Sequence, residues 1–253
     1  MSPLTRPTPL PRTWIGSLFV STAVVAAALV VAVALAYAVR VRYAERSVSV
    51  TGSATQRIRS DRVMWTATVF ARAPALADAY RVLQNGVPRV RRFLVEGGLP
   101  EAEITVGSIE TTELYARNED GVEIREQIIG YELTQPVGVT SARIPLVTRL
   151  SQDVTQLIQD GVDVRSDAPE YIYTGLGALK VRLIAEATRD AHDRAAKVAR
   201  NTASYLGPLV SARVGVVQVN AANESEVSWD GVYDRTSIEK DAMVAVTTIF
   251  AVE

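Results

Sequence analysis

Hydrophobic residues fill one long stretch near the start of the chain, with no charged residue between Trp14 and Val39. A helix of about 20 apolar residues spans the bilayer core, so this run is long enough to cross it. Trp14 and Tyr37 lie near its two ends, where aromatic side chains favour the headgroup layer. We therefore predict a transmembrane helix over residues 14–39, preceded by a short cytoplasmic tail (1–13) and followed by a linker (40–46).

The same stretch has features of a cleaved signal peptide. Arg6 and Arg12 form a basic start, and residues 34–38 (Ala-Leu-Ala-Tyr-Ala) have the small residues of a cleavage site. The apolar run exceeds the roughly 7–15 residues of a signal peptide, which favours a retained anchor. Cleavage near Ala38 and secretion stay the alternative. Arginines are nearly balanced on the two sides, so the short tail and long domain decide the orientation, with the domain in the periplasm or outside the cell.

Beyond residue 46 the apolar spacing alternates between a strand period and a helix period. Strand spacing is found at 47–51, ending near Gly52, and at 62–72, 104–115, 128–140, 171–173, 214–219 and 243–252. Helical spacing is found over 75–96, 146–158 and 179–206. The order β-β-α-β-β-α-β-α-β-β predicts a two-layer α+β domain over residues 47–253, with helices on one face of a mainly antiparallel sheet.

Two prolines and one row of small residues refine this picture. Pro88 predicts a kink in the first helix, and Pro136 predicts an edge strand or a bulge, because proline has no N–H to donate. The last helix has a predicted apolar stripe of small and medium residues that would let it lie close to a sheet. The stripe comprises Ile184, Ala187, Ala191, Ala195, Val198, Thr202 and Leu206.

Composition excludes several classes of protein. Residues 47–253 contain 22 Lys and Arg against 27 Asp and Glu, and this acidic balance disfavours a nucleic-acid partner, because binding to phosphates needs a basic face. The chain has no cysteine and one histidine, so neither a disulfide framework nor a typical zinc site is expected.

Four local patterns superficially match catalytic or binding motifs. His192 is the only histidine and lies on a charged helix, while the glycines of 175–180 lack the spacing of a phosphate-binding loop. The carboxylates of 118–123 lack the spacing of a calcium loop, and Ser237-x-x-Lys240 lacks the companion motifs of its enzyme class. We therefore predict no catalytic residue, no cofactor and no metal site.

The least ordinary feature of the domain is an aromatic pair in a long polar loop, residues 221–241. Trp229, Val232 and Tyr233 interrupt an otherwise polar sequence there. Aromatic residues are enriched where proteins contact one another. These three residues are the candidate interface.

The motifs, taken in order, identify a resemblance. Residues 47–52 with 61–63, 129–133 with 160–162, and above all 183–199 running into Leu-Gly-Pro-Leu-Val at 206–210 resemble the SIMPL-domain family of bacterial envelope proteins. The resemblance covers residues 47–253. It implies the fold, an envelope location and a loose link to oxidative or envelope stress, and it implies no catalytic residues or cofactor.

We accordingly expect a non-enzymatic protein of the inner membrane, bound to the bilayer through residues 14–39 and self-associating as a homo-oligomer through exposed sheet edges and the aromatic loop. One alternative is a periplasmic module that binds a small ligand. A hydrolase is the second alternative, for which the sequence has no adequate pair of nucleophile and base.

Overall fold

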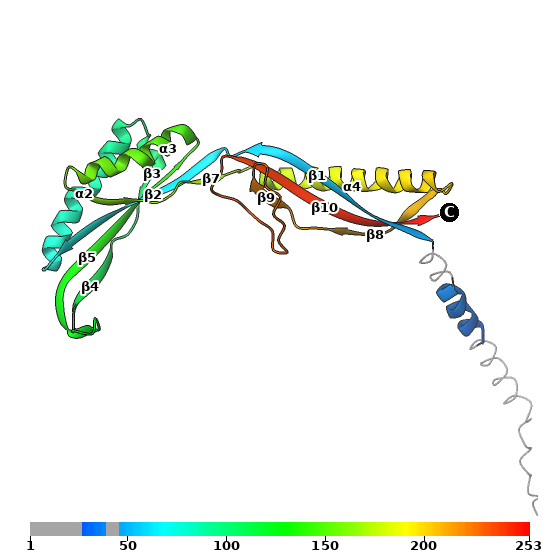
Figure 1. Cartoon of the computed structure of the whole chain (residues 1–253), viewed down its shortest axis with the longest axis horizontal. Coiled ribbons are helices and arrows are strands. Elements are labelled where there is room, and N and C mark those ends of the chain that lie inside the picture. The colour runs from blue at the N-terminus through cyan, green and yellow to red at the C-terminus, as the bar shows by residue number, and fades with distance from the viewer. Residues whose placement is uncertain (1–26, 39–45) are drawn as a thin grey trace, which may run out of the picture. The chain divides into compact units, whose positions relative to one another are not determined.

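The computed structural model describes residues 27–38 and 46–253 (Figure 1). Residues 27–38 are helical and exposed, and the rest of the predicted membrane segment 14–39 lies outside the described residues, as do the tail 1–13 and residues 40–45 of the linker. No helix within the described ranges is long and apolar enough to cross a membrane.

Residues 46–253 belong to two compact units. One contains 46–52, 191–213 and 247–253, and the other contains Ser53–Asp190 and Val214–Val246. Strands β1 (Ser47–Arg59) and β10 (Glu239–Val252) and helix α4 (Leu176–Asn201) contribute residues to both. The predicted α+β class and the antiparallel pairing of the larger sheet are confirmed.

The larger unit is built on a six-stranded sheet of order β3-β5-β2-β6, in which β4 also pairs with β5 and β7 with β2. Helices α2 (Leu76–Glu96) and α3 (Ile144–Asp153) pack on this sheet (Figure 1). Two 3-10 turns, Glu101–Glu103 and Val154–Ile158, follow the helices. The strands are β2 (Arg62–Ala73), β3 (Ile104–Val106), β4 (Glu110–Arg117), β5 (Glu123–Ser141), β6 (Asp163–Ser166) and β7 (Glu170–Ile172).

The core of this sheet follows the predicted period of two. Val63, Trp65, Ala67 and Val69 of β2 are all buried on one face. On β5, Leu133, Val137 and Val139 are buried, whereas Ile129 is exposed. Helix α2 continues through Pro88, and Gly86 lets it approach β2, since a Cβ at Gly86 would lie 3.1 Å from Val69 Cγ1.

Pro136 does not mark an edge, because β5 pairs with β2 on one side and with β3 and β4 on the other. The irregularity lies in the neighbouring segment of the sheet, where the single strand predicted over 104–115 is divided into β3 and β4. Gly107 N donates to Pro136 O at 2.8 Å, and proline has no N–H to return the bond. The Gln135 amide donates to Gly107 O at 2.9 Å instead, so a side chain replaces the missing ladder bond.

The second sheet has the order β1-β10-β8, and β9 also pairs with β10. Three boundaries differ from the prediction. Strand β1 continues past Gly52 to Arg59, the predicted strand 214–219 is replaced by β8 (Leu206–Val214) and β9 (Gln218–Ala221), and β6 was not predicted. Helix α4 ends at Asn201 rather than Leu206, because Ala203 adopts a left-handed conformation with φ 52°.

Helix α4 presents a stripe of every fourth residue to the sheet. The predicted Ala187, Ala191 and Ala195 are fully buried, and Leu179, Leu183 and Ala199, which were not predicted, complete the stripe. Val198 is exposed, and Leu206 lies in β8. The helix rotation was therefore correct at its centre and wrong at its ends.

Replacing Ala191 or Ala195 with leucine is expected to lower the free energy of unfolding by about 1–3 kcal/mol, because the added carbons have no space against the sheet. Replacing His192 with alanine is the matched control, since its side chain is 59% exposed. Thermal and urea unfolding of the three variants measure the difference. A neutral Ala195→Leu together with a severe His192→Ala would contradict this helix rotation.

Candidate functional site

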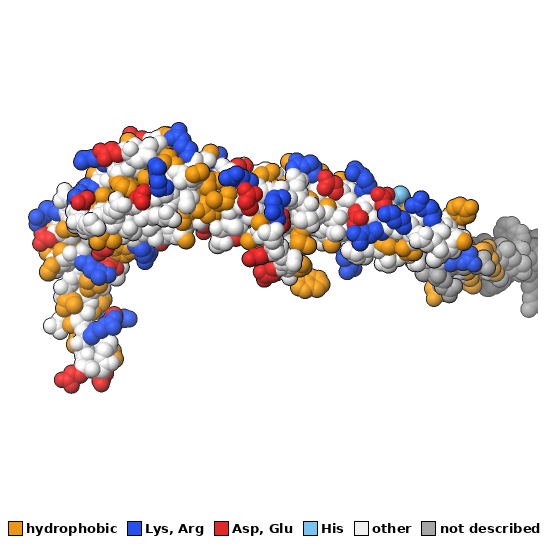
Figure 2. Space-filling view, turned by 45° about the horizontal axis from the view of Figure 1, so that its top comes forward, with side chains coloured by type: hydrophobic (Ala, Val, Ile, Leu, Met, Phe, Trp, Pro, Cys, Tyr) orange, Lys and Arg blue, Asp and Glu red, His pale blue; other side chains and the backbone are white. Residues whose placement is uncertain are grey.

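The loop between β9 and β10, residues 222–238, presents one aromatic side chain to solvent. Trp229 is 96% exposed, and Val227 on the same loop and Val216 before β9 are also exposed. Figure 2 shows hydrophobic and acidic side chains together on this projecting loop. A fully exposed tryptophan is unusual, because its large apolar surface contributes most when it is buried.

Two buried amides of β9 hold the loop on either side of Trp229. The Gln218 side chain donates to Ser228 O at 2.8 Å and accepts from Val232 N at 2.7 Å. Asn220 Nδ2 donates to Glu226 O at 2.9 Å. Since Gln218 and Asn220 are both buried, these bonds are shielded from water and anchor the loop backbone on both sides of Trp229.

The other two predicted interface residues have structural roles. Val232 O accepts from Val219 N at 2.8 Å, which ties the loop along β9. Tyr233 packs against the core cluster around Leu179 and Leu183, and its hydroxyl accepts from Tyr173 N at 3.2 Å. The structure thus leaves Trp229 as the residue of the three that is free to contact a partner.

The loop ends in a cluster around Asp234. Thr236 and Ser237 donate backbone and hydroxyl hydrogen bonds to this carboxylate, and Lys240 Nζ donates to Asp234 Oδ2 at 3.0 Å and to Asp234 O at 2.7 Å. Burial raises the pKa of Asp234, but hydrogen bonds from Ser237, Thr236 and Lys240 outweigh it, and the pKa lies well below its ordinary value. The Ser237-x-x-Lys240 pattern is part of this structural turn.

Carboxylates surround the exposed tryptophan. Residues 222–234 include four acidic and no basic side chains. Asp234 is engaged as described, whereas Glu224, Glu226 and Asp230 have no ion-pair partner among the described residues. The loop therefore presents an exposed apolar side chain surrounded by negative charge.

The remaining candidates form no catalytic constellation in the described part of the chain. His192 is exposed, and its Nδ1 atom lies 3.4 Å from Asp193 Oδ1. Its ring contacts the Phe250 ring edge-on, with the two ring centroids 5.8 Å apart. Residues 176–180 of the predicted 175–180 segment form the start of α4, and Asp61 accepts from Thr174 N and Oγ1 just before the helix, so this segment has a structural role. No group of three metal-ligating side chains occurs within residues 27–38 and 46–253.

Strand β8 forms an open edge. Its residues 208–214 are all exposed, including Leu209, Val210 and Val214, and no strand or loop of the described chain pairs with its outer side. Tyr205 and Glu253 exchange both backbone hydrogen bonds. Because bonding alternates along an antiparallel strand, the N–H groups of Val210 and Ala212 point away from β10.

The other edges of this sheet are each contacted by another part of the chain. On β1, Asp190 Oδ2 accepts from Ser53 N at 2.9 Å. On β9, Val219 is bridged to Tyr233 of the loop, and Asp234 N donates to Val219 O at 2.8 Å. An edge strand left uncovered presents a template for pairing with another chain.

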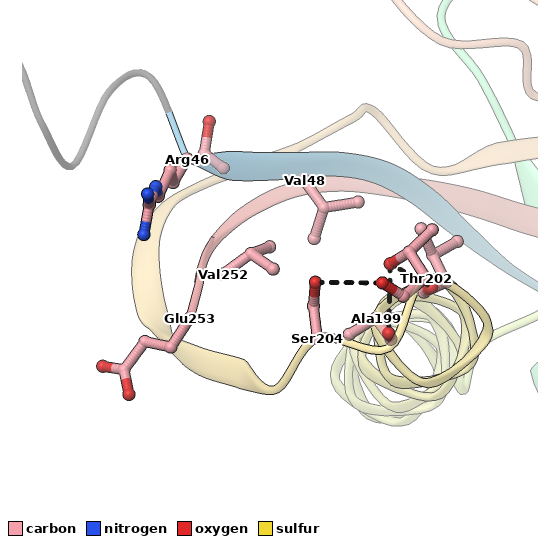
Figure 3. A pocket seen from close by; sticks show the side chains of 9 residues that line it. Arg46, Val48, Ala199, Thr202, Ser204, Val252 and Glu253 are labelled. Atoms are coloured by element: carbon pink, nitrogen blue, oxygen red, sulfur yellow. Dashed lines mark hydrogen bonds between the residues drawn. The ribbon is translucent and has the colours of Figure 1, made fainter.

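The unit formed by 46–52, 191–213 and 247–253 contains a cavity of about 430 Å³ between the end of α4 and the sheet (Figure 3). Val48 and Val252 point into it from the strands and Ser204 from the loop after α4, as Figure 3 shows, and Val198 and Ala199 add apolar surface. Arg46 and Glu253 lie at its rim, with their charged ends directed away from the apolar interior.

The model of the SIMPL family, described as a protein of unknown function (DUF541), matches residues 48–251. The chain belongs to the SIMPL family. No curated protein matches it. The predicted resemblance is confirmed. The matched range includes the Trp229 loop and nearly all of both sheets, whereas Arg46, Ser47, Val252 and Glu253 of the cavity lining lie just outside it.

Sequence reasoning missed three parts of the candidate sites. The cavity joins residues from the two ends of the SIMPL domain, which no local pattern reveals. The roles of Gln218 and Asn220 depend on a loop that folds back on β9. The open edge of β8 was missed because the predicted helix ended at Leu206 and the next predicted strand began at Val214, which left residues 207–213 without an element.

Proposed function

We propose that this SIMPL protein is a membrane-anchored, non-catalytic protein of the bacterial cell envelope that self-associates through β8. The observation that carries the proposal is the open edge of β8, with exposed Leu209, Val210 and Val214. Two copies of one edge strand pair in antiparallel fashion around a twofold axis, which extends the sheet and removes both open edges.

The Trp229 loop supports a role in protein contacts. A large aromatic side chain on a preorganised backbone loses little conformational freedom on binding, and such residues dominate binding energies at interfaces. The surrounding carboxylates disfavour insertion into an anionic membrane and favour a protein surface with basic groups. The apolar run 14–39 supports the membrane anchor.

The test is the mass of the full chain in detergent, measured by light scattering over a concentration series. We expect masses above the 27.4 kDa of one chain. Val210→Pro removes an outward N–H and is expected to shift the protein to monomer, while Val210→Ala keeps that donor and most of the association. Trp229→Ala tests separately whether the loop contributes to self-association. A monomer at every concentration would contradict self-association.

A further inference from the structure

We infer that the cavity at the end of α4 is a phospholipid site that takes an ethanolamine headgroup at its rim and the adjoining acyl chain in its interior. The inference rests on the membrane anchor of the proposed function but does not depend on pairing through β8. It starts from three features of the same cavity, which are its position, its lining and its charges.

The cavity is close in sequence to the predicted membrane anchor, so lipid lies within its reach. Arg46 lines the cavity and is the last residue of the predicted linker 40–46. Seven residues of extended chain span at most about 25 Å. Val252 N donates to Arg46 O at 2.9 Å, which fixes Arg46 to β10. If the anchor ends at Val39, the cavity therefore lies within about 25 Å of the bilayer surface.

The lining matches an amphiphile. The volume of about 430 Å³ falls within the usual range for small-molecule sites. Val48, Val198, Ala199 and Val252 supply apolar walls, and Ser47, Thr202 and Ser204 supply hydroxyl groups.

The charges discriminate among headgroups. Arg46 and Glu253 occupy the rim together (Figure 3), so the guanidinium is available to the phosphate and the carboxylate to an ammonium group. Phosphatidylethanolamine carries both groups, and its ammonium donates three hydrogen bonds.

The experiment titrates the full chain, in lipid-free detergent, with short-chain phosphatidylethanolamine, phosphatidylglycerol and phosphatidylcholine. Calorimetry gives the affinities. We expect phosphatidylethanolamine to bind about tenfold more tightly than the other two lipids. Ser204→Trp fills the interior and is expected to abolish binding, while Tyr205→Trp, which adds bulk outside the lining, leaves it unchanged.

Two rim variants leave the interior intact and keep the test valid if Ser204→Trp fails to fold. Arg46→Gln is expected to weaken binding of all three lipids by about tenfold, and Glu253→Lys to change the preference to phosphatidylglycerol. Equal binding of the three lipids, a preference of the unaltered chain for phosphatidylglycerol, or affinities unchanged by both rim variants would overturn the inference.

Intact mass of the same preparation tests the anchor separately. A mature chain beginning near Val39 would contradict the membrane anchor of the proposed function, while the titration would still report whether the cavity binds lipid. Likewise, loss of self-association in Val210→Pro without a change in lipid affinity separates the β8 contact from the lipid site.

Discussion

Replacing Lys240 with alanine is expected to lower the free energy of unfolding by about 3–5 kcal/mol, because it leaves the Asp234 carboxylate in a largely buried site without its cation. The Lys240 side chain is fully buried, and only 12% of the Asp234 side chain is exposed. The ammonium also satisfies Asp234 O, at 2.7 Å, so the substitution removes a second hydrogen bond.

The matched control is Arg59→Ala, which removes an exposed ion pair with Glu239 at 3.5 Å. Exposed pairs contribute about 0–1 kcal/mol, so this variant should unfold close to the unaltered protein. Urea unfolding at neutral pH measures both. A loss for Lys240→Ala no larger than that for Arg59→Ala would show that the buried pair contributes little.

The pH dependence of stability provides a second test of the Asp234–Lys240 pair. The pKa of Asp234 is lowered in the folded state, so its contribution is complete above the ordinary aspartate pKa of about 3.9 and is lost as the pH falls through the lower, folded value. Without Lys240 the folded pKa is lowered less. The stability difference between the unaltered protein and Lys240→Ala should therefore narrow below about pH 4.

Lys240 also affects the Trp229 loop. Asp234 closes the loop on the β10 side, as Gln218 and Asn220 do on the β9 side. Loss of the pair therefore frees one end of the segment that presents Trp229. We expect Lys240→Ala to weaken any contact made by Trp229 even under conditions in which the domain remains folded, because the preorganisation is lost.

The predictions from the sequence were most accurate where the spacing of apolar residues within one element determines which of its faces is buried. The alternation of Val63, Trp65, Ala67 and Val69 fixed the buried face of β2, and the spacing of Ala187, Ala191 and Ala195 fixed the buried face of α4. A period does not reveal which segments become neighbours. Pro136 was correctly seen as a missing donor, but only the pairing of β5 shows that Gly107 faces it and that Gln135 compensates.

The candidate site shows the same contrast between what a local pattern predicts and what only the fold reveals. The loop composition singled out Trp229, Val232 and Tyr233, because aromatic residues in a polar segment need an explanation. Burial then separates them, since Tyr233 joins a core cluster formed with α4 while Trp229 has no such contact. That distinction depends on residues distant in sequence, such as Tyr173, whose N–H bonds the Tyr233 hydroxyl.

The two tryptophans of the SIMPL domain provide a matched comparison of these environments. Trp65→Ala is expected to lower the free energy of unfolding by about 3–5 kcal/mol through the loss of a large buried side chain. Trp65 is 2% exposed, and its indole N–H donates to Ser166 Oγ at 3.0 Å and to Asp167 O at 3.1 Å. Ser166 Oγ in turn donates to Ser151 O at 2.6 Å, so the ring joins β2 to the end of β6 and to α3.

Trp65→Phe keeps most of the apolar ring and loses the N–H donor, so its cost should be smaller, about 1–2 kcal/mol. Trp229→Ala changes a side chain that is 96% exposed and should alter stability by less than about 0.5 kcal/mol. Urea unfolding of the three variants under one set of conditions decides the comparison. A Trp229→Ala loss comparable to that of Trp65→Ala would mean that Trp229 is buried within its own chain, and its assignment as a contact residue would then be wrong.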